Sequence, residues 1–326
     1  MPRLRRIFAF AFVLLSATAV QARVVSVEIT HKQIVAQGKR FGLAGIYEAI
    51  AGKLHFAVDP KDPANAAIAD ISLAPRNGAG EVEFAADFYF IRPQDLEKGN
   101  GAVLFEVSNR GGKGMLGFFS GAERSSAPLT AAQFGDGFLL ERGLSLLWVG
   151  WQFDMPLEPG LLRVYVPVAK NADGSAITGP VRANIIVSGT AFSHSLADRG
   201  HIPYEAADPS DPRNVLTVRD TANGPARVIP RGEWSFARWD KGEAVPDRGS
   251  LYLNGGLQPN KVYDLVYVAK DPPVAGLGMA AVRDAVAYLK YGGDEAMGVK
   301  AGELARVYSF GSSQSGRFLR TFLYEG

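Results

Sequence analysis

The spacing of apolar and polar residues in the first third of the chain predicts β-strands. The two kinds alternate over residues 24–30 (VVSVEIT), which is the period of a strand with one buried face. Residues 45–60 and 80–93 have similar strand-like patterns, and the Asp- and Pro-rich stretch DPKDPANA separates them. We therefore expect the early part of the chain to be rich in β-structure.

From residue 101 the pattern becomes typical of α/β proteins. Residues 101–107 and 144–153 are nearly continuous apolar runs, as found in parallel strands that are buried on both faces. Residues 129–143 have helical spacing, so the three segments predict a strand–helix–strand unit. The same pattern returns as a helix over residues 276–292, and a strand and a helix follow over residues 305–324.

Between these two α/β stretches, residues 160–255 have a different character. Short β-like pieces alternate there with many Pro, Gly, Asp and Asn residues, which predicts a β-rich insertion. Its aromatic residues Trp234, Phe236 and Trp239 could form a lid or a substrate wall, or could simply pack within a β-sheet. Residues 261–271 are expected to form its last strand.

The first 22 residues have the pattern of a secretory signal peptide. Three arginines precede an apolar run over residues 7–15, and Val20 and Ala22 occupy the small-residue positions before a cleavage site. The run is too short to cross a bilayer core of about 30 Å. We expect cleavage near Ala22, a periplasmic or secreted location in a bacterium, and no stable membrane anchor afterwards.

Composition and charge exclude several classes of function. The 326 residues include 35 basic and 33 acidic ones, and this near balance does not indicate nucleic acid as a partner. There is no cysteine, which excludes disulfides, thiolate catalysis and cysteine-bound zinc. No tight spacing of metal ligands is present, and in the GLGMAA stretch (276–281) the segment DPP separates the first glycine from the preceding strand, whereas a dinucleotide site opens directly from its strand. We therefore expect no metal and no cofactor.

The stretch VYSFGSSQSGRFLR, residues 307–320, predicts a strand, a sharp turn and a helix. A serine nucleophile at such a turn needs small residues two positions before and two positions after it. Ser312 has Phe310 before it and Ser315 has Arg317 after it, so both fail. Only Ser313, between Gly311 and Ser315, meets the requirement. An ordinary polar turn that serines cap would have a similar sequence.

Two backbone segments could stabilise an oxyanion beside Ser313. The N–H of Gln314 lies at the predicted start of the helix, where N–H groups are free. The segment SNRGG, residues 108–112, follows the first buried strand, and a second donor is expected near Arg110 and Gly111. A glycine-rich turn without a function would have the same sequence.

The segment GSSQSGRFLR resembles the G-x-S-Q-S-G-R turn of large exported bacterial proteins with an α/β-hydrolase domain. Four further segments resemble other blocks of that family in the same order: GIYEAIAGKLHFAVDP, ISLAPRNGAGEVEF, NRGG and GLGMAAVRDAVAYLKYG. Ser312 stands where an aromatic residue is expected. The resemblance implies an α/β-hydrolase fold over residues 23–326, with Ser313 as nucleophile and the Asn109–Gly112 loop in the oxyanion hole.

The general base is the missing part of this interpretation. All four histidines precede Ser313, whereas α/β-hydrolases place the acid and the histidine after the serine. His194 and His201 lie in the insertion and could line a pocket together with Asn109 and Trp234, or act as the base. The resemblance implies instead that the triad acid and histidine are absent from this chain. We then expect an α/β-hydrolase fold that is incomplete at the C-terminus, with little or no turnover.

The sequence therefore predicts a serine hydrolase that acts on a small ester-like substrate through Ser313. The alternative is a non-catalytic periplasmic binding or scaffold protein in which the serine turn has no catalytic role.

Overall fold

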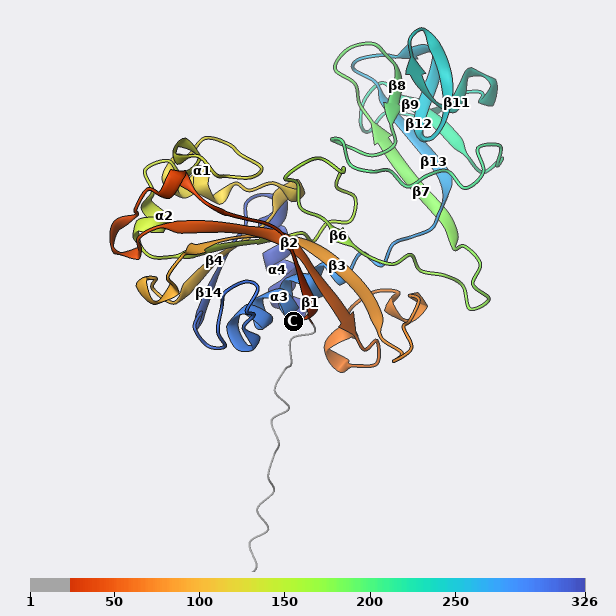
Figure 1. The fold of residues 1–326 in the computed structure, drawn as a ribbon. Coiled ribbons are helices and arrows are strands. Elements are labelled where there is room, and N and C mark those ends of the chain that lie inside the picture. Colours follow the sequence, from red (N-terminus) through yellow and green to blue (C-terminus); the bar gives the residue numbers. More distant parts are fainter. Residues whose placement is uncertain (1–23, 326) are drawn as a thin grey trace, which may run out of the picture.

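The computed structural model describes residues 24–325, and it contains a large mixed sheet and two smaller antiparallel sheets (Figure 1). The predicted signal peptide, residues 1–22, lies outside the described residues. In the large sheet the strands run in the order β1-β2-β3-β5-β4-β14, and β6 also pairs with β3. Its strands are β1 (Val24–Ile34), β2 (Tyr47–Val58), β3 (Val82–Pro93), β4 (Ala102–Val107), β5 (Ser145–Val149), β6 (Val164–Tyr165) and β14 (Arg306–Phe310).

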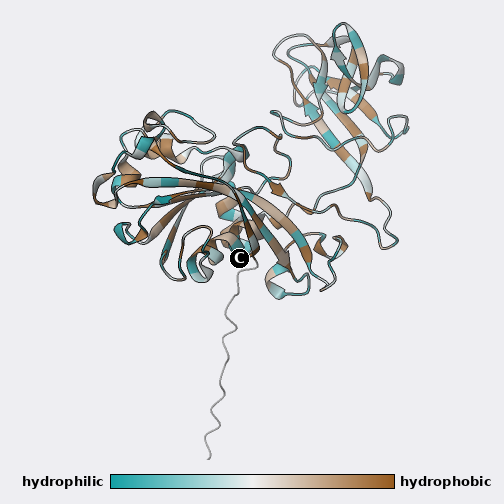
Figure 2. Ribbon diagram, in the orientation of Figure 1, coloured by the Kyte–Doolittle hydropathy of each residue, from teal (hydrophilic) through white to brown (hydrophobic). Residues whose placement is uncertain are grey.

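The pairing in this sheet changes direction at β5. Strands β1, β2, β3 and β5 pair antiparallel, whereas β5, β4 and β14 pair parallel. The apolar runs in β4 and β5 are at the centre of the sheet, where Val103, Leu146 and Val149 have no exposed surface. Figure 2 shows hydrophobic residues along the strands of this sheet.

Among residues 24–325, four α-helices accompany the large sheet: α1 (Met115–Ser120), α2 (Phe138–Glu141), α3 (Leu277–Ala287) and α4 (Gln314–Glu325). Helix α3 buries Leu277, Ala281 and Ala285 in the main core. A Cβ on Gly278 would lie 2.0 Å from the backbone oxygen of Trp151, so only glycine permits this approach. The glycines of GLGMAA thus allow close packing of the helix on the segment after β5.

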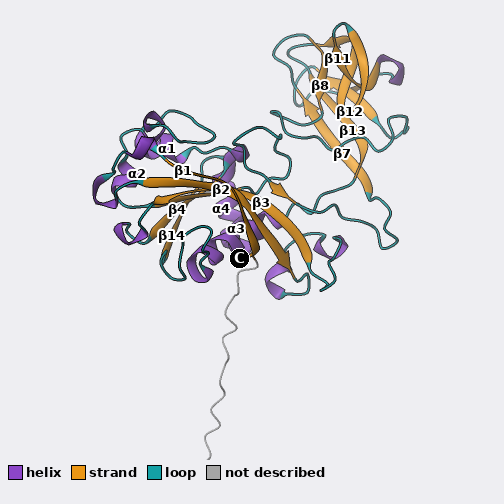
Figure 3. Ribbon diagram, viewed as in Figure 1, coloured by secondary structure: helices purple, strands orange, loops and turns teal. Residues whose placement is uncertain are grey.

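Residues 178–270 form a second body made almost entirely of strands (Figures 1 and 3). One sheet has the order β10-β9-β13-β7 and the other has the order β11-β12-β8. Buried residues such as Leu216, Leu251 and Leu265 form a separate core between them. The strands are β7 (Thr178–Ile185), β8 (Ala191–Ser195), β9 (Val215–Arg219), β10 (Arg227–Val228), β11 (Trp234–Asp240), β12 (Glu243–Leu257) and β13 (Val262–Lys270).

The prediction of an α/β-hydrolase fold is wrong for this structure. The molecule is β-rich, with 37% strand and 21% helix, and its sheets are mixed or antiparallel with few helices. Residues 129–143, predicted as one helix, form only a 3₁₀ turn and the four-residue helix α2. The buried apolar runs β4 and β5 do pair parallel as expected, but the long antiparallel strands β1, β2 and β3 account for much of the large sheet, and few helices cover it.

Within residues 24–325, no helix is long and apolar enough to cross a membrane.

Candidate active site

The three parallel strands end at one edge of the large sheet, and the loops that follow them are joined there. The loop after β4 contains Asn109, whose side-chain amide donates to the Ser312 carbonyl at 3.2 Å. The backbone N–H of Arg110 donates to Oε1 of Gln152, in the loop after β5, at 2.9 Å. Ligand sites of sheets with parallel strands commonly lie beyond the carboxyl ends of those strands.

Ser313 occupies the tightest part of the turn between β14 and α4. Its φ angle is 58°, in the left-handed region that non-glycine residues rarely adopt. A Cβ on Gly311 would lie 2.7 Å from the carbonyl carbon and oxygen of Ser315. The turn therefore has the close approach between the residues flanking Ser313 that the sequence pattern predicts. Ser313 itself is exposed, whereas the Ser315 side chain is buried.

Replacing Gly311 with alanine is expected to destabilise the protein by about 1–3 kcal/mol, since the added methyl group would overlap backbone atoms. The same change should lower any reactivity of Ser313 at least about tenfold, because the turn must open. Gly232→Ala is a matched control, since a Cβ at Gly232 meets no atom within 4 Å. Urea unfolding of both variants measures the difference. Equal stability of the two variants would contradict the described turn.

The two segments expected to supply oxyanion donors differ in whether their backbone N–H groups are already hydrogen-bonded. The N–H of Gln314, the first residue of α4, has no hydrogen-bond acceptor among the described residues. The N–H of Arg110 is already bonded to Gln152, so it is not free to contact an oxyanion. Gly111 packs against Leu162, whose backbone N–H donates to the Gly111 carbonyl at 2.9 Å. Of the Gln314 and Arg110 N–H groups, the geometry thus favours Gln314, and the bond at the Gly111 carbonyl does not involve the Gly111 N–H, which remains a candidate donor.

A cavity of about 590 Å³ lies beside the turn. Ser313, Gln314 and Arg317 line it from the turn and α4, and Arg110 lines it from the loop after β4. The β-rich body forms much of the rest, through residues 196–199 and 201–204 and two strand residues, Val181 and Tyr267.

An acid–histidine pair lines the same cavity. His201 Nδ1 lies 2.7 Å from Asp154 Oδ2, and the two side chains are 16% and 26% exposed. A second bond, from the Ile202 N–H to the Asp154 carbonyl at 2.7 Å, joins the same two loops. His201 was a candidate from the sequence, but Asp154 was missed. Asp154 follows directly after the predicted strand of residues 144–153, and nothing in the segment WQFD (151–154) marks it as a site residue.

The other predicted pocket residues lie elsewhere. His194 is in β8, where its Nδ1 lies 2.6 Å from the Ser195 carbonyl, and it does not line the cavity. Trp234 is only 3% exposed and packs against Phe236 in the core of the β-rich body. Asn109 links two loops and lines a neighbouring cavity with Ser312.

That neighbouring cavity, about 840 Å³, contains a buried carboxylate and a lysine. Burial raises the pKa of Glu106, although its carboxylate accepts hydrogen bonds from the N–H groups of Gly114 and Met115 and from Trp148. Burial also lowers the pKa of Lys113 to about 7, although the charge of Glu106 opposes this. Glu106 thus ties β4 to the start of α1, and neither group lines the cavity of Ser313.

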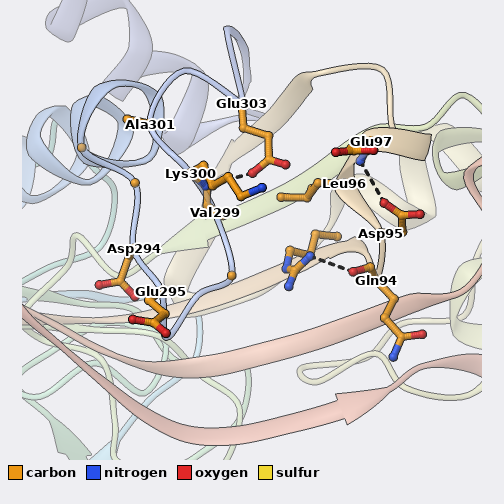
Figure 4. Close-up of a pocket in the computed structure, with 14 residues that line it drawn as sticks. Gln94, Asp95, Leu96, Glu97, Asp294, Glu295, Val299, Lys300, Ala301 and Glu303 are labelled. Atoms are coloured by element: carbon orange, nitrogen blue, oxygen red, sulfur yellow. Dashed lines mark hydrogen bonds between the residues drawn. The ribbon is translucent and has the colours of Figure 1, made fainter.

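A third cavity, of about 610 Å³, lies at the opposite edge of the sheet, near the segments that precede β4 and β14 (Figure 4). Residues 94–97 face residues 294–303 across it, and Arg92 forms a buried ion pair with Glu48 at 2.7 Å. Its lining contains no histidine and no serine. This cavity therefore lacks the serine and the histidine that line the cavity beside the turn.

No group of three or more His, Asp or Glu residues that could hold a metal ion occurs between residues 24 and 325. No protein-family model, no curated protein and no solved structure matches the chain. The functional assignment therefore depends on the geometry at the turn.

Proposed function

We propose that the chain is a serine hydrolase that cleaves small ester-like substrates with Ser313 as the nucleophile. The observation that carries the proposal is the backbone of Ser313, which has a φ angle of 58° in an exposed strand-to-helix turn. A non-glycine residue is strained in this conformation, and such strain concentrates at functional sites. The free N–H of Gln314 and the adjacent cavity support the same conclusion.

The proposed reaction is acyl transfer to water. The Ser313 oxygen attacks the ester carbonyl and loses its proton to a base, while the Gln314 N–H donates to the developing oxyanion. The carbon–oxygen bond to the alcohol then breaks, and the alcohol leaves with a proton. Water attacks the acyl-serine and releases the acid with Ser313 restored.

Substrate class and location are parts of the same proposal. A cavity of about 590 Å³ is within the range that holds small molecules. The leader-like pattern of residues 1–22 supports a periplasmic or secreted location. The resemblance of the GSSQSGR turn to exported bacterial hydrolases supports the chemistry, although the observed fold is not the α/β-hydrolase fold that the resemblance implies.

A fluorophosphonate probe tests the proposal directly, because it forms a stable adduct with activated serines. Trypsin should release the turn as the peptide Val307–Arg317, which contains four serines. Fragmentation of the labelled peptide should place the adduct on Ser313, and heat-denatured protein should give none. The absence of an adduct on the folded protein, or an adduct on another serine, would refute the proposal and favour a non-catalytic binding protein.

A further inference from the structure

A serine nucleophile needs a base, and one histidine in this chain is placed to act as one. His201 lines the cavity that Ser313 also lines, whereas His31, His55 and His194 do not. His31 and His55 contact Gln33 and Glu28 on the first two strands, and His194 is in β8. His201 is therefore the candidate base because it is the histidine that lines the same cavity as Ser313.

The contact with Asp154 sets the orientation of the His201 ring. When Nδ1–H donates to the carboxylate, Nε2 carries the lone pair and can accept a proton. The carboxylate also stabilises the imidazolium that forms when the proton arrives. Asp154 thus acts on His201 as a positioning residue, and His201 would be the group that exchanges the proton.

The pair is fixed by the backbone as well as by its own contact. The Ile202 N–H donates to the Asp154 carbonyl, and the His201 N–H donates to the Asp198 carbonyl at 3.1 Å. The rings of Phe153 and Tyr204, which neighbour the pair, lie 6.0 Å apart. The loop after β5 and the loop after β8 are therefore joined where the two bodies face the cavity.

We propose that Asp154 and His201 form the acid–base pair that activates Ser313. The inference rests on the proposed hydrolase function and supplies its base from the β-rich body. The chain order is acid, histidine, serine, which differs from the order in α/β-hydrolases but occurs in unrelated serine proteases.

Each step of the mechanism conserves protons. Nε2 of His201 takes the proton of Ser313 as the serine oxygen bonds to the acyl carbon, and the imidazolium then gives that proton to the leaving alcohol. In the second half, Nε2 takes a proton from water and returns it to Ser313. Ser313 and His201 are not hydrogen-bonded to each other in the described structure, so the mechanism requires that the two side chains come within hydrogen-bond distance when substrate binds. Catalytic hydrogen bonds are often long before substrate binds.

His201→Gln, His201→Ala and Asp154→Asn test the proposal in the full chain, with His194→Gln as the matched control. We expect His201→Gln to slow labelling of Ser313 by a fluorophosphonate at least about 10³-fold, and Asp154→Asn to slow it by about 10²–10⁴-fold. His194→Gln should stay within about twofold. Added imidazole should restore part of the labelling rate in His201→Ala, which a purely structural histidine would not allow.

A pH profile gives a second readout. The dependence of the wild-type labelling rate on pH should change in His201→Gln. Other charged or titratable groups that line the cavity are common to both proteins, so they cancel in the comparison; they are Arg110, Asp154, Asp198, Arg199, Tyr204, Tyr267 and Arg317.

The possible outcomes separate the two proposals. Wild-type labelling rates in His201→Gln, or no imidazole rescue of His201→Ala, would overturn the base assignment and leave the Ser313 hydrolase intact. Failure of the wild-type protein to label at Ser313 would overturn both. If His201→Gln lowers the melting temperature, Asp154→Asn and the imidazole rescue still decide the question.

Discussion

Ser313→Ala is expected to lower kcat for hydrolysis of p-nitrophenyl acetate at least about 10³-fold, which corresponds to about 4 kcal/mol of lost transition-state stabilisation. The change removes the attacking oxygen and leaves the oxyanion donor and the cavity in place. Alanine carries a Cβ like serine, so the strained φ angle of 58° should cost about the same in both proteins. The melting temperature should therefore change little, and steady-state kinetics isolates the chemical role.

The neighbouring serines serve as controls for this experiment. Ser312→Ala should keep kcat within several-fold, because Ser312 has a bulky residue, Phe310, two positions before it and lines the other cavity. Ser315→Ala should keep both activity and stability, because the buried Ser315 oxygen has no hydrogen-bond partner. Loss of turnover in Ser312→Ala and its retention in Ser313→Ala would assign the nucleophile to Ser312 and contradict the argument from the turn.

The local parts of the structure could be predicted from the sequence. Alternation and apolar runs located the strands of the large sheet to within a few residues, since the period of apolar residues reflects which faces are buried, although β6 was expected to belong to the insertion. The steric rule at the turn singled out Ser313, and in the structure a Cβ added at Gly311 would lie 2.7 Å from the Ser315 backbone. Such features depend on residues close together in the chain, so a single sequence contains the information.

The long-range parts could not be predicted in the same way. The antiparallel pairing of β1, β2 and β3 in the same sheet as β4 and β5 depends on how distant strands assemble, and the β-rich mixed fold was therefore mistaken for an α/β-hydrolase. The contact between Asp154 and His201 joins loops 47 positions apart, and no spacing rule links them. Arg110 was expected to donate to an oxyanion, but a side chain 42 positions later, Gln152, accepts its N–H.

Asp264→Ala is expected to lower the free energy of unfolding by about 2–4 kcal/mol, the largest stability effect that we predict. Asp264 lies in β13 with its side chain only 10% exposed, and it accepts hydrogen bonds from Arg182 of β7 and Arg219 of β9. Its removal leaves two guanidinium groups without their shared acid, which is costly for the less exposed Arg219. Urea unfolding at pH 7 measures the effect. Asp240→Asn, at an exposed ion pair with Arg238, is a control that should change stability by less than about 1 kcal/mol.

The stability that Asp264 contributes should depend on pH, and this gives the prediction a second test. Burial alone would raise the pKa of Asp264, but hydrogen bonds from Asn184 and Arg182 and the charges of Arg182 and Arg219 outweigh it and hold the pKa below its usual value. A carboxylate with a lowered pKa stabilises the folded protein above its unfolded pKa, and this contribution is lost as the pH falls through the folded value. Below about pH 4 the wild-type protein should therefore lose stability more steeply than Asp264→Asn does. Parallel curves for the two proteins would show that the carboxylate is not ion-paired in solution.

Because β7 and β13 also carry Val181 and Tyr267 into the cavity, loosening this sheet should lower the reactivity of Ser313 before the large sheet unfolds.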